Sequence, residues 1–290
     1  MGFSHVIRLL SLSAIWGASF LFMRIGAPVL GPALLIQIRV GLAALFLLAV
    51  AAWLRRPLPL ARQGRHFLML GGFNSALPFL LFAFAAQTVS ASLLSVLNAT
   101  APIWAALIGA LWQKKRLAPK ALLGLALGVA GVALLAGGEA LRLPAGGWQA
   151  IAAGLAAACS YGIATTYAKS APAVEPFANA HGSMWGATLL LMPLTLATAR
   201  PMAMPPTLVW ASVLALGVLC SGVAYLLYFR LVADLGAAPA LTVTYLIPLF
   251  GILWGALLLG EPVGWTMLAG GALVLAGTAL VTGFTPWRRG

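Results

Sequence analysis

Acidic side chains are the scarcest feature of this sequence, which has 4 aspartates and glutamates in 290 residues against 17 lysines and arginines. Charged residues together make up 7% of the chain, whereas soluble globular proteins have roughly 25%. This deficit excludes an ordinary soluble domain. The 62% of hydrophobic residues and the mean hydropathy of +1.03 instead predict an all-α integral membrane protein embedded in a lipid bilayer.

Reactive and metal-binding side chains are scarce as well. The chain has 2 cysteines, Cys159 and Cys220, and both fall within apolar stretches, where cysteine behaves as a small hydrophobic residue. No structural disulfide, metal site or cofactor is therefore expected. A membrane enzyme usually gathers Asp, Glu, His or Lys at one membrane face. Because the sequence has no such cluster, we expect a protein that is not an enzyme.

Long apolar segments are abundant, and ten of them approach the length of about 20 residues that a bilayer requires. The predicted transmembrane spans are residues 7–27, 33–54, 67–86, 91–112, 120–137, 148–168, 176–198, 208–233, 237–259 and 264–284. The basic residues occur in short runs between these spans, as is typical of cytoplasmic loops. The net charge of +13 therefore does not indicate nucleic-acid binding.

The second half of the chain repeats the first at an offset of about 146 residues. This offset pairs Gly71 with Gly217 and Pro102 with Pro248, and other small residues stay in register over the whole half. Such spacing indicates an internal duplication. We therefore predict two five-span repeats, residues 1–140 and residues 141–290.

An odd number of spans in each repeat has a topological consequence. The second repeat must enter the membrane from the opposite side, so the two halves form an inverted repeat. Inverted repeats are a hallmark of secondary transporters, which place the substrate between the halves near the midplane and expose it alternately to each side. The basic residues gather on the side of the membrane that holds both termini, which predicts cytoplasmic N- and C-termini.

Several motifs carry a resemblance to a known family. These are Ala14–Phe20 (AIWGASF), Arg39, Pro102, Pro248 and Gly255–Pro262 (GALLLGEP). Together they resemble the EamA-type transporters of the drug/metabolite transporter superfamily. The resemblance implies a bacterial inner-membrane exporter of small metabolites, with neutral or aromatic amino acids as the first choice and a proton-coupled exporter of cationic drugs or other metabolites as the alternative. Lys115 departs from the pattern, because the repeat places it opposite Glu261.

A set of polar and aromatic side chains is predicted to lie near the middle of the membrane. Aromatic walls with a few polar groups suit a small amphiphilic metabolite, whereas the alternative role for buried polar groups is to hold helices together. As a set they are better explained as the lining of a substrate cavity. The predicted substrate-binding residues are Trp16, Asn74, Phe79, Asn98, Tyr161, Ser221, Tyr225, Thr244 and Tyr245.

Four further residues are candidates for gating or charge. Arg39 could attract a substrate carboxylate, although snorkelling of its long side chain to the outer interface is favoured. His181 could take a proton, but a packing histidine is more common. Pro102 and Pro248 each remove a backbone hydrogen bond and should kink their helices, which would open the cavity or free carbonyl groups for the substrate.

The four acidic residues all fall at predicted span ends or in loops. A carrier driven by protons or sodium commonly has a carboxylate at membrane depth, so facilitated diffusion or exchange is favoured here. The alternative is that Glu175 or Glu261 lies deeper than the pattern suggests. Gly124 and Gly128 indicate a close-packing face in the fifth span, either within a monomer or across a homodimer.

Overall fold

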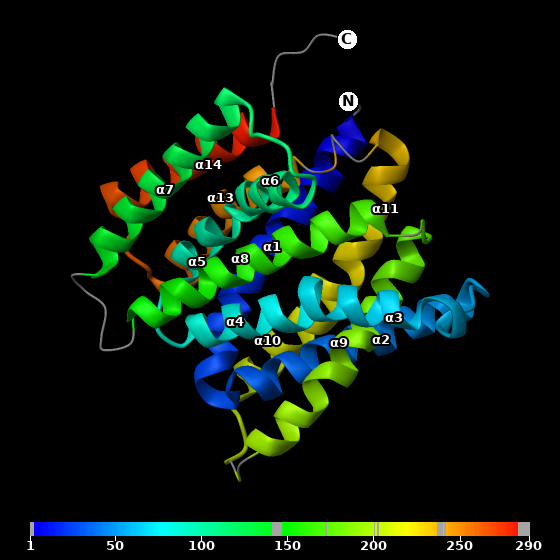
Figure 1. The fold of residues 1–290 in the computed structure, drawn as a ribbon. Coiled ribbons are helices and arrows are strands. Elements are labelled where there is room, and N and C mark those ends of the chain that lie inside the picture. Colours follow the sequence, from blue (N-terminus) through cyan, green and yellow to red (C-terminus); the bar gives the residue numbers. More distant parts are fainter. Residues whose placement is uncertain are drawn as a thin grey trace.

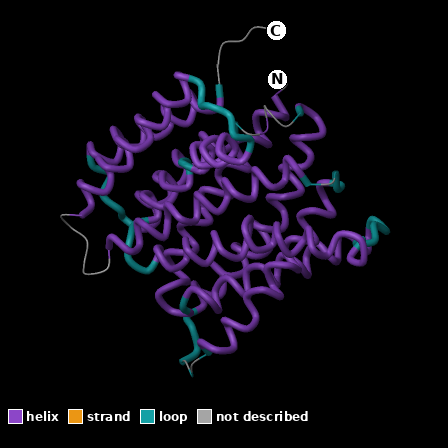
Figure 2. The backbone as a smooth tube through the Cα atoms, in the orientation of Figure 1, coloured by secondary structure: helices purple, strands orange, loops and turns teal. Residues whose placement is uncertain are grey.

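The computed structural model describes residues 3–140, 147–171, 173–199, 203–236 and 242–283, together with residues 201 and 240. Throughout these ranges the regular structure is helical, and Figure 2 shows helices joined by short loops without any strand. The prediction of an all-α membrane protein is confirmed.

The helices follow the ten predicted spans with differences of a few residues at their ends. In order along the chain they are α1 (Phe3–Leu30), α2 (Pro32–Trp53), α3 (Leu60–Leu70), η1 (Gly71–Ala76), α4 (Leu77–Ala86), α5 (Ala91–Asn98), α6 (Ala101–Trp112), α7 (Pro119–Ala140), α8 (Gly147–Ser170), α9 (Pro176–Thr198), α10 (Thr207–Leu214), η2 (Ala215–Val223), α11 (Ala224–Leu235), α13 (Val243–Leu259) and α14 (Trp265–Thr282). Eight of the resulting spans are long and apolar enough to cross a membrane, and α13 is a shorter apolar helix of 17 residues.

Three spans are irregular in ways that hydropathy does not reveal. The third span consists of α3, η1 and α4, and the eighth of α10, η2 and α11, so each carries a π-helical segment, η1 or η2, in its interior. The fourth span is broken between α5 and α6 at Ala99 and Thr100, directly before Pro102. Each irregularity lies in the interior of its span rather than at an end.

Helix packing follows the two-fold relation expected of an inverted repeat. The fifth and tenth spans, α7 and α14, pack side by side along their lengths (Figure 1), and so do the second and seventh spans, α2 and α9. The contact of α1 with α13 has its counterpart in that of α8 with α6, and the contact of η1 with α9 has its counterpart in that of η2 with α2. These pairs exchange the first half of the chain with the second.

Glycine explains why α7 and α14 approach so closely. A Cβ atom on Gly124 would lie 2.5 Å from the carbonyl oxygen of Gly277, and one on Gly131 would lie 2.7 Å from that of Gly270. The two backbones are therefore in direct contact, as small residues allow in membrane helices. Of the two roles open from the sequence, the Gly124 face serves packing within one chain.

The bundle has two polar ends, which we call the terminal face and the opposite face. The terminal face holds the start of α1 and the end of α14, and there Arg8 pairs with Asp234 and Arg56 with Glu175. The opposite face holds Glu261, near the start of α5, and the end of α4. These three acidic side chains therefore lie at span ends, as the sequence suggested.

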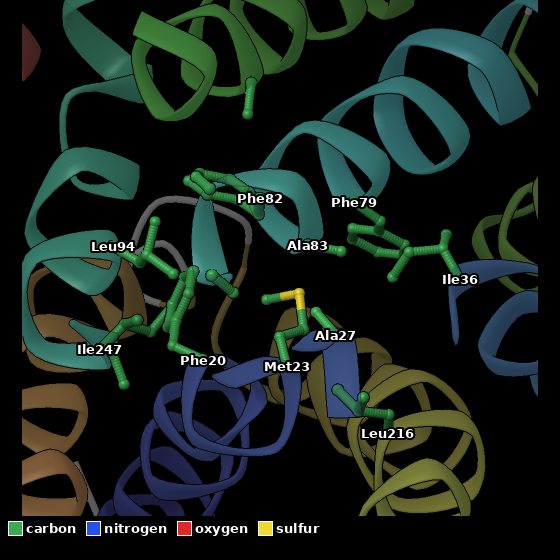
Figure 3. Packing of buried hydrophobic residues seen from close by; sticks show 14 of the residues in the cluster. Phe20, Met23, Ala27, Ile36, Phe79, Phe82, Ala83, Leu94, Leu216 and Ile247 are labelled. Atoms are coloured by element: carbon green, nitrogen blue, oxygen red, sulfur yellow. The ribbon is translucent and has the colours of Figure 1, made fainter. Parts of the chain in front are cut away.

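The apolar core runs through the bundle and takes buried residues from both repeats. Figure 3 shows Phe20 and Met23 of α1 packed among Phe82 of α4, Leu94 of α5 and Ile247 of α13. The rings of Phe20 and Phe82 meet edge to face, with centroids 5.4 Å apart. Residues of both repeats thus pack together in this core.

Candidate functional site

The two π-helical segments occupy equivalent places in the two repeats. Gly71 opens η1 and Gly217 lies in η2, in accordance with the 146-residue offset. A Cβ atom on Gly71 would lie 2.6 Å from the backbone nitrogen of Ala187 in α9, and one on Gly217 would lie 2.6 Å from Cβ of Leu42 in α2. Such segments are rare and often mark functional sites. The positions of η1 and η2 therefore indicate a candidate site in the middle of the bundle.

Side chains from the first span of each repeat bind to these segments. Trp16 of α1 donates from Nε1 to the carbonyl oxygen of Cys220 in η2 at 3.1 Å. In the other repeat, the hydroxyl of Ser160 in α8 donates to the carbonyl oxygen of Phe73 in η1 at 2.7 Å. Since α1 and η2 belong to different halves, as do α8 and η1, these bonds join the halves at the centre.

Arg39 is buried in this region, contrary to the expectation that it snorkels to the outer interface. Its side chain lies in α2, and the residue is 3% exposed. The guanidinium donates from Nε to the hydroxyl of Ser221 in η2 at 2.9 Å, and its central carbon lies 3.7 Å from the ring centroid of Phe79 in α4. Snorkelling was wrong because these partners, together with Met23 at 3.8 Å from one terminal nitrogen, hold the side chain inside the bundle.

Aromatic rings from four spans lie in the same region. Trp16 meets Tyr225 of α11 edge to face at 6.2 Å between centroids and lies 5.6 Å from the ring of Tyr228. Tyr161 of α8 lies 6.3 Å from Phe82. Tyr161 and Tyr225 are half-buried, and both lie within electrostatic reach of Arg39. Asn74 of η1 lies beside Tyr225.

Asn98 ends α5 at the break in the fourth span. Its side chain is half-buried, and it shares a helix face with Leu94, one turn earlier, which belongs to the central core. Two carbonyl groups beside the break are bonded, because the Thr100 hydroxyl donates to Leu97 O at 2.7 Å and the Thr278 hydroxyl of α14 donates to Ala99 O at 2.8 Å. Those two carbonyls are therefore not free for a substrate.

Of the remaining predicted residues, Tyr245 and His181 have partners outside this central group. The hydroxyl of Tyr245 hydrogen-bonds to Thr282 of α14 near the terminal face, so it points toward α14 rather than between the halves. His181 is 2% exposed and accepts a 3.0 Å hydrogen bond from Trp185 in its own helix, which fits the packing role. Thr244 is a half-buried neighbour of Tyr245, and Pro248 lies inside an unbroken α13, unlike Pro102.

Sequence reasoning missed the role of Glu261 on the opposite face. Its carboxylate accepts hydrogen bonds from the backbone nitrogens of Ala91 and Ser92 at 2.7 and 3.0 Å, and from the Ser92 hydroxyl at 2.6 Å. The side chain of Ser90 accepts from Leu93 N at 3.1 Å, so the first three backbone N–H groups of α5 are all bonded. The acidic residue at the end of the ninth span thus holds the start of the fourth.

Small residues bring α13 close enough for that contact. A Cβ atom on Gly251 would collide with the side chain of Ser95, and one on Gly255 would collide with Ser92 and Glu261. The repeat mate of Gly255 is Gly109, where a Cβ atom would lie 3.9 Å from the Thr166 hydroxyl, an ordinary contact distance. The mate of Glu261 is Lys115, which is exposed. The contact at the opposite face is therefore not reproduced by those residues at the terminal face.

A second missed group bridges three spans near the terminal face. His66 of α3 lies 3.1 Å from the Tyr167 hydroxyl of α8 and 2.8 Å from Oδ1 of Asn179 in α9. A lone histidine in a basic loop region gave no signal for this role.

Two shallow clefts lie near the terminal face along α6. One, of about 240 Å³, is lined by Gly109, Trp112, Gln113, Thr166, Lys169 and Ser170. The other, of about 370 Å³, is lined by Leu107, Ala110, Leu111, Lys115, Arg116, Leu117 and Leu122.

The geometry suits binding more readily than chemistry. Within the described ranges, no three His, Cys, Asp or Glu side chains lie together as a metal-binding group. The central group combines a buried cation, neutral hydrogen-bonding side chains and aromatic rings, contributed by both halves. An arrangement of this kind can hold a small amphiphilic molecule between the repeats.

Comparisons with known proteins extend over the whole chain. The profile described as "EamA-like transporter family" matches residues 4–137 and again residues 148–283. A protein of Streptantibioticus cattleyicolor named "Probable terminal-alkyne amino-acid exporter" is 29% identical over 279 residues, which are 94% of this chain and 92% of the relative. The "Uncharacterized transporter YoaV" of Bacillus subtilis is 25% identical over 288 residues, 98% of each chain. A solved crystal structure, 18% identical, shares the fold with a TM-score of 0.62 over 96% of this chain and 97% of its own.

Proposed function

Because the chain belongs to the EamA-like transporter family, we propose that it exports small metabolites, neutral or aromatic amino acids foremost, by alternating access between its two halves. It is a multi-pass membrane protein and a transporter rather than an enzyme. The amino-acid class is supported by the printed name of one relative, a probable exporter of terminal-alkyne amino acids. The central group supports it independently, since an amino acid needs partners for a polar end and an apolar side chain.

The observation that carries the proposal is the joining of the halves at the centre. Trp16 and Ser160, from the first span of each repeat, donate to carbonyl groups of η2 and η1 in the other repeat. A molecule held among Trp16, Tyr161, Tyr225 and Asn98 would touch both halves at once. Rocking one half against the other would then expose it to either side in turn.

We orient the terminal face toward the cytoplasm of a bacterial cell, in its inner membrane. Among the described residues, the loops of the terminal face carry many basic side chains, whereas Arg24 is the one that lies near the opposite face. Excess Lys and Arg in short loops marks the cytoplasmic side. The terminal-face residues are Arg8, Arg55, Arg56, Arg62, Arg65, Lys114, Lys115, Arg116, Lys120, Lys169 and Arg230.

We further propose that transport needs no proton or sodium gradient. Glu175, Asp234 and Glu261 are engaged at the two faces by Arg56, Arg8 and the start of α5. A coupling carboxylate at membrane depth, common in ion-driven carriers, is absent among these three. A proton-coupled exporter of cationic drugs is the second candidate, but the buried Arg39 cation disfavours a positively charged cargo at the centre.

Counterflow in proteoliposomes tests the function. The purified protein is reconstituted, loaded with an unlabelled amino acid, nucleoside or cationic drug, and supplied with the labelled compound outside. Saturable counterflow of neutral or aromatic amino acids at equal pH and sodium on both sides is the expected result. Flux that never saturates and shows no counterflow would identify a channel, and flux that vanishes without an ion gradient would refute the uncoupled mechanism.

A further inference from the structure

Among the residues that the structure describes, the buried guanidinium of Arg39 has no acidic partner. Of the four acidic residues in the sequence, Glu175, Asp234 and Glu261 are engaged at the two faces. The fourth, Glu139, lies in the last turn of α7, a helix that packs mainly against α14. Among the residues that the structure describes, no ion pair includes Arg39.

An unpaired buried charge is costly, and arginine cannot escape the cost by losing its proton. In the described part of the chain, the contacts of the Arg39 guanidinium are neutral: the Ser221 hydroxyl, the Met23 sulfur and the face of Phe79. Such partners offset part of the desolvation but do not neutralise the charge. A bound anion would do so.

The fold itself does not require a charge at this position. Gly71 and Gly217 are repeat mates and pack against Ala187 and Leu42. The same relation places Met184, which is fully buried, opposite Arg39. An apolar side chain therefore fills the equivalent place in the second repeat, so the charge on Arg39 calls for an explanation other than packing.

The hydrogen bonds of Arg39 to described residues use only part of its guanidinium group. They engage Nε and one terminal nitrogen, whereas the guanidinium has five N–H donors in a planar fork that matches a carboxylate. Tyr161 and Tyr225 lie within electrostatic reach of it and supply further neutral hydrogen-bonding groups. The aromatic ring of Trp16 lies beside Tyr225 at 6.2 Å between centroids.

We propose that Arg39 is the anchor for the carboxylate of the transported metabolite, so that the cargo must be an anion or a zwitterion at its polar end. This inference rests on the proposed function and narrows its substrate class. The Arg39 fork receives the carboxylate, and the rings of Trp16, Tyr161 and Tyr225 contact the remainder of the cargo. Alternation between the two faces gives the cargo access to this buried position.

The first test needs only the wild-type protein. Binding in detergent and counterflow in liposomes are measured with L-phenylalanine, L-phenylalaninamide and 2-phenylethylamine, and with the corresponding L-leucine series. The compounds in each series differ at the carboxylate alone. We expect the amino acids to bind roughly 10- to 100-fold more tightly than the other two, the usual range for hydrogen bonds to charged groups.

The second test replaces the charge. Arg39→Met copies the side chain of the repeat mate and should fold, as judged by its elution profile and melting temperature. It should lose the preference for the amino acid over the amide and the amine. Arg39→Lys keeps the charge without the fork and should recover part of the preference. Arg24→Met is the matched control, because Arg24 binds the carbonyl oxygen of Ala86 near the opposite face at 2.8 Å.

The outcomes separate this inference from the proposed function. If the amides and amines exchange as well as the amino acids in the wild type, transport stands and the carboxylate anchor is overturned. If none of the compounds exchanges, the proposed function fails and the anchor falls with it. In a third outcome, chloride stabilises the wild-type protein relative to methanesulfonate at equal ionic strength, Arg39→Met loses this effect, and L-phenylalanine does not change it. Such a result would assign the guanidinium to an inorganic ion and would also overturn the proposal.

Discussion

Glu261→Gln should loosen the contact between α13 and the start of α5. The glutamate carboxylate accepts three hydrogen bonds, from Ala91 N, Ser92 N and Ser92 Oγ, at 2.6 to 3.0 Å. It also places a negative charge at the positive end of the α5 dipole. Glutamine keeps one acceptor oxygen and the side-chain volume, but it loses the charge and the second acceptor.

The magnitude follows from these losses. Charge at a helix N-terminus contributes about 0.3–1 kcal/mol, and the net contribution of a hydrogen bond is about 0.5–1.5 kcal/mol. We therefore expect the local opening of α5 to become about 1–2 kcal/mol easier, since such terms do not add fully. At about 1.4 kcal/mol for each tenfold change, amide exchange at Ala91 and Ser92 should accelerate about 5- to 30-fold.

Hydrogen–deuterium exchange of the detergent-solubilised protein, resolved by peptide, measures this effect where it should occur. Glu175→Gln serves as the matched control, because Glu175 pairs with Arg56 at an exposed site, where a salt bridge contributes about 0–1 kcal/mol. Unchanged exchange at the start of α5 in Glu261→Gln, or an increase no larger than that caused by the control, would refute the capping role.

Three further predictions concern the site and the topology. Asn98→Ala should weaken substrate binding by about 1–3 kcal/mol if a buried hydrogen bond to the ligand is lost, with a normal melting temperature; Gln87→Ala, at an exposed amide, is the control, and normal binding with lowered stability would make Asn98 a helix contact instead. Trp16→Phe removes the bond to Cys220 O and should lower the unfolding free energy by about 1 kcal/mol; an unchanged melting temperature without substrate would contradict this. A topology reporter fused after Arg289 should be active in the cytoplasm, and activity restricted to the periplasm would reverse the proposed orientation.

Hydropathy and the repeat were sufficient to predict much of this molecule. Ten spans, the inversion of the halves and the equivalence of Gly71 with Gly217 all follow from patterns that extend over many residues. Trp16, Tyr161, Tyr225 and Ser221 were predicted at similar depth, and the structure brings them near one another.

The rest depends on contacts between residues distant in the sequence. A π-helical segment arises from one local change in hydrogen bonding, for which composition has no signature. Glu261 stands at the end of its own span, and the sequence does not tell that its partners are Ala91 and Ser92. Arg39 was misjudged because snorkelling is a property of an isolated helix, whereas Ser221 and Phe79 come from other spans.

The unequal pair Glu261 and Lys115 bears on which access state the unloaded carrier populates. Two perfectly equivalent halves would give the two access states the same free energy, and the unloaded protein would divide itself equally between them. Glu261 bonds the start of α5 at one face, whereas its repeat mate Lys115 cannot accept such bonds. We expect this difference to favour the state closed at the opposite face. Equilibrium forbids such a bias from driving net flux. We expect it to set which access state the unloaded protein favours: with the proposed orientation, this is the state open to the compartment from which an exporter must collect its cargo.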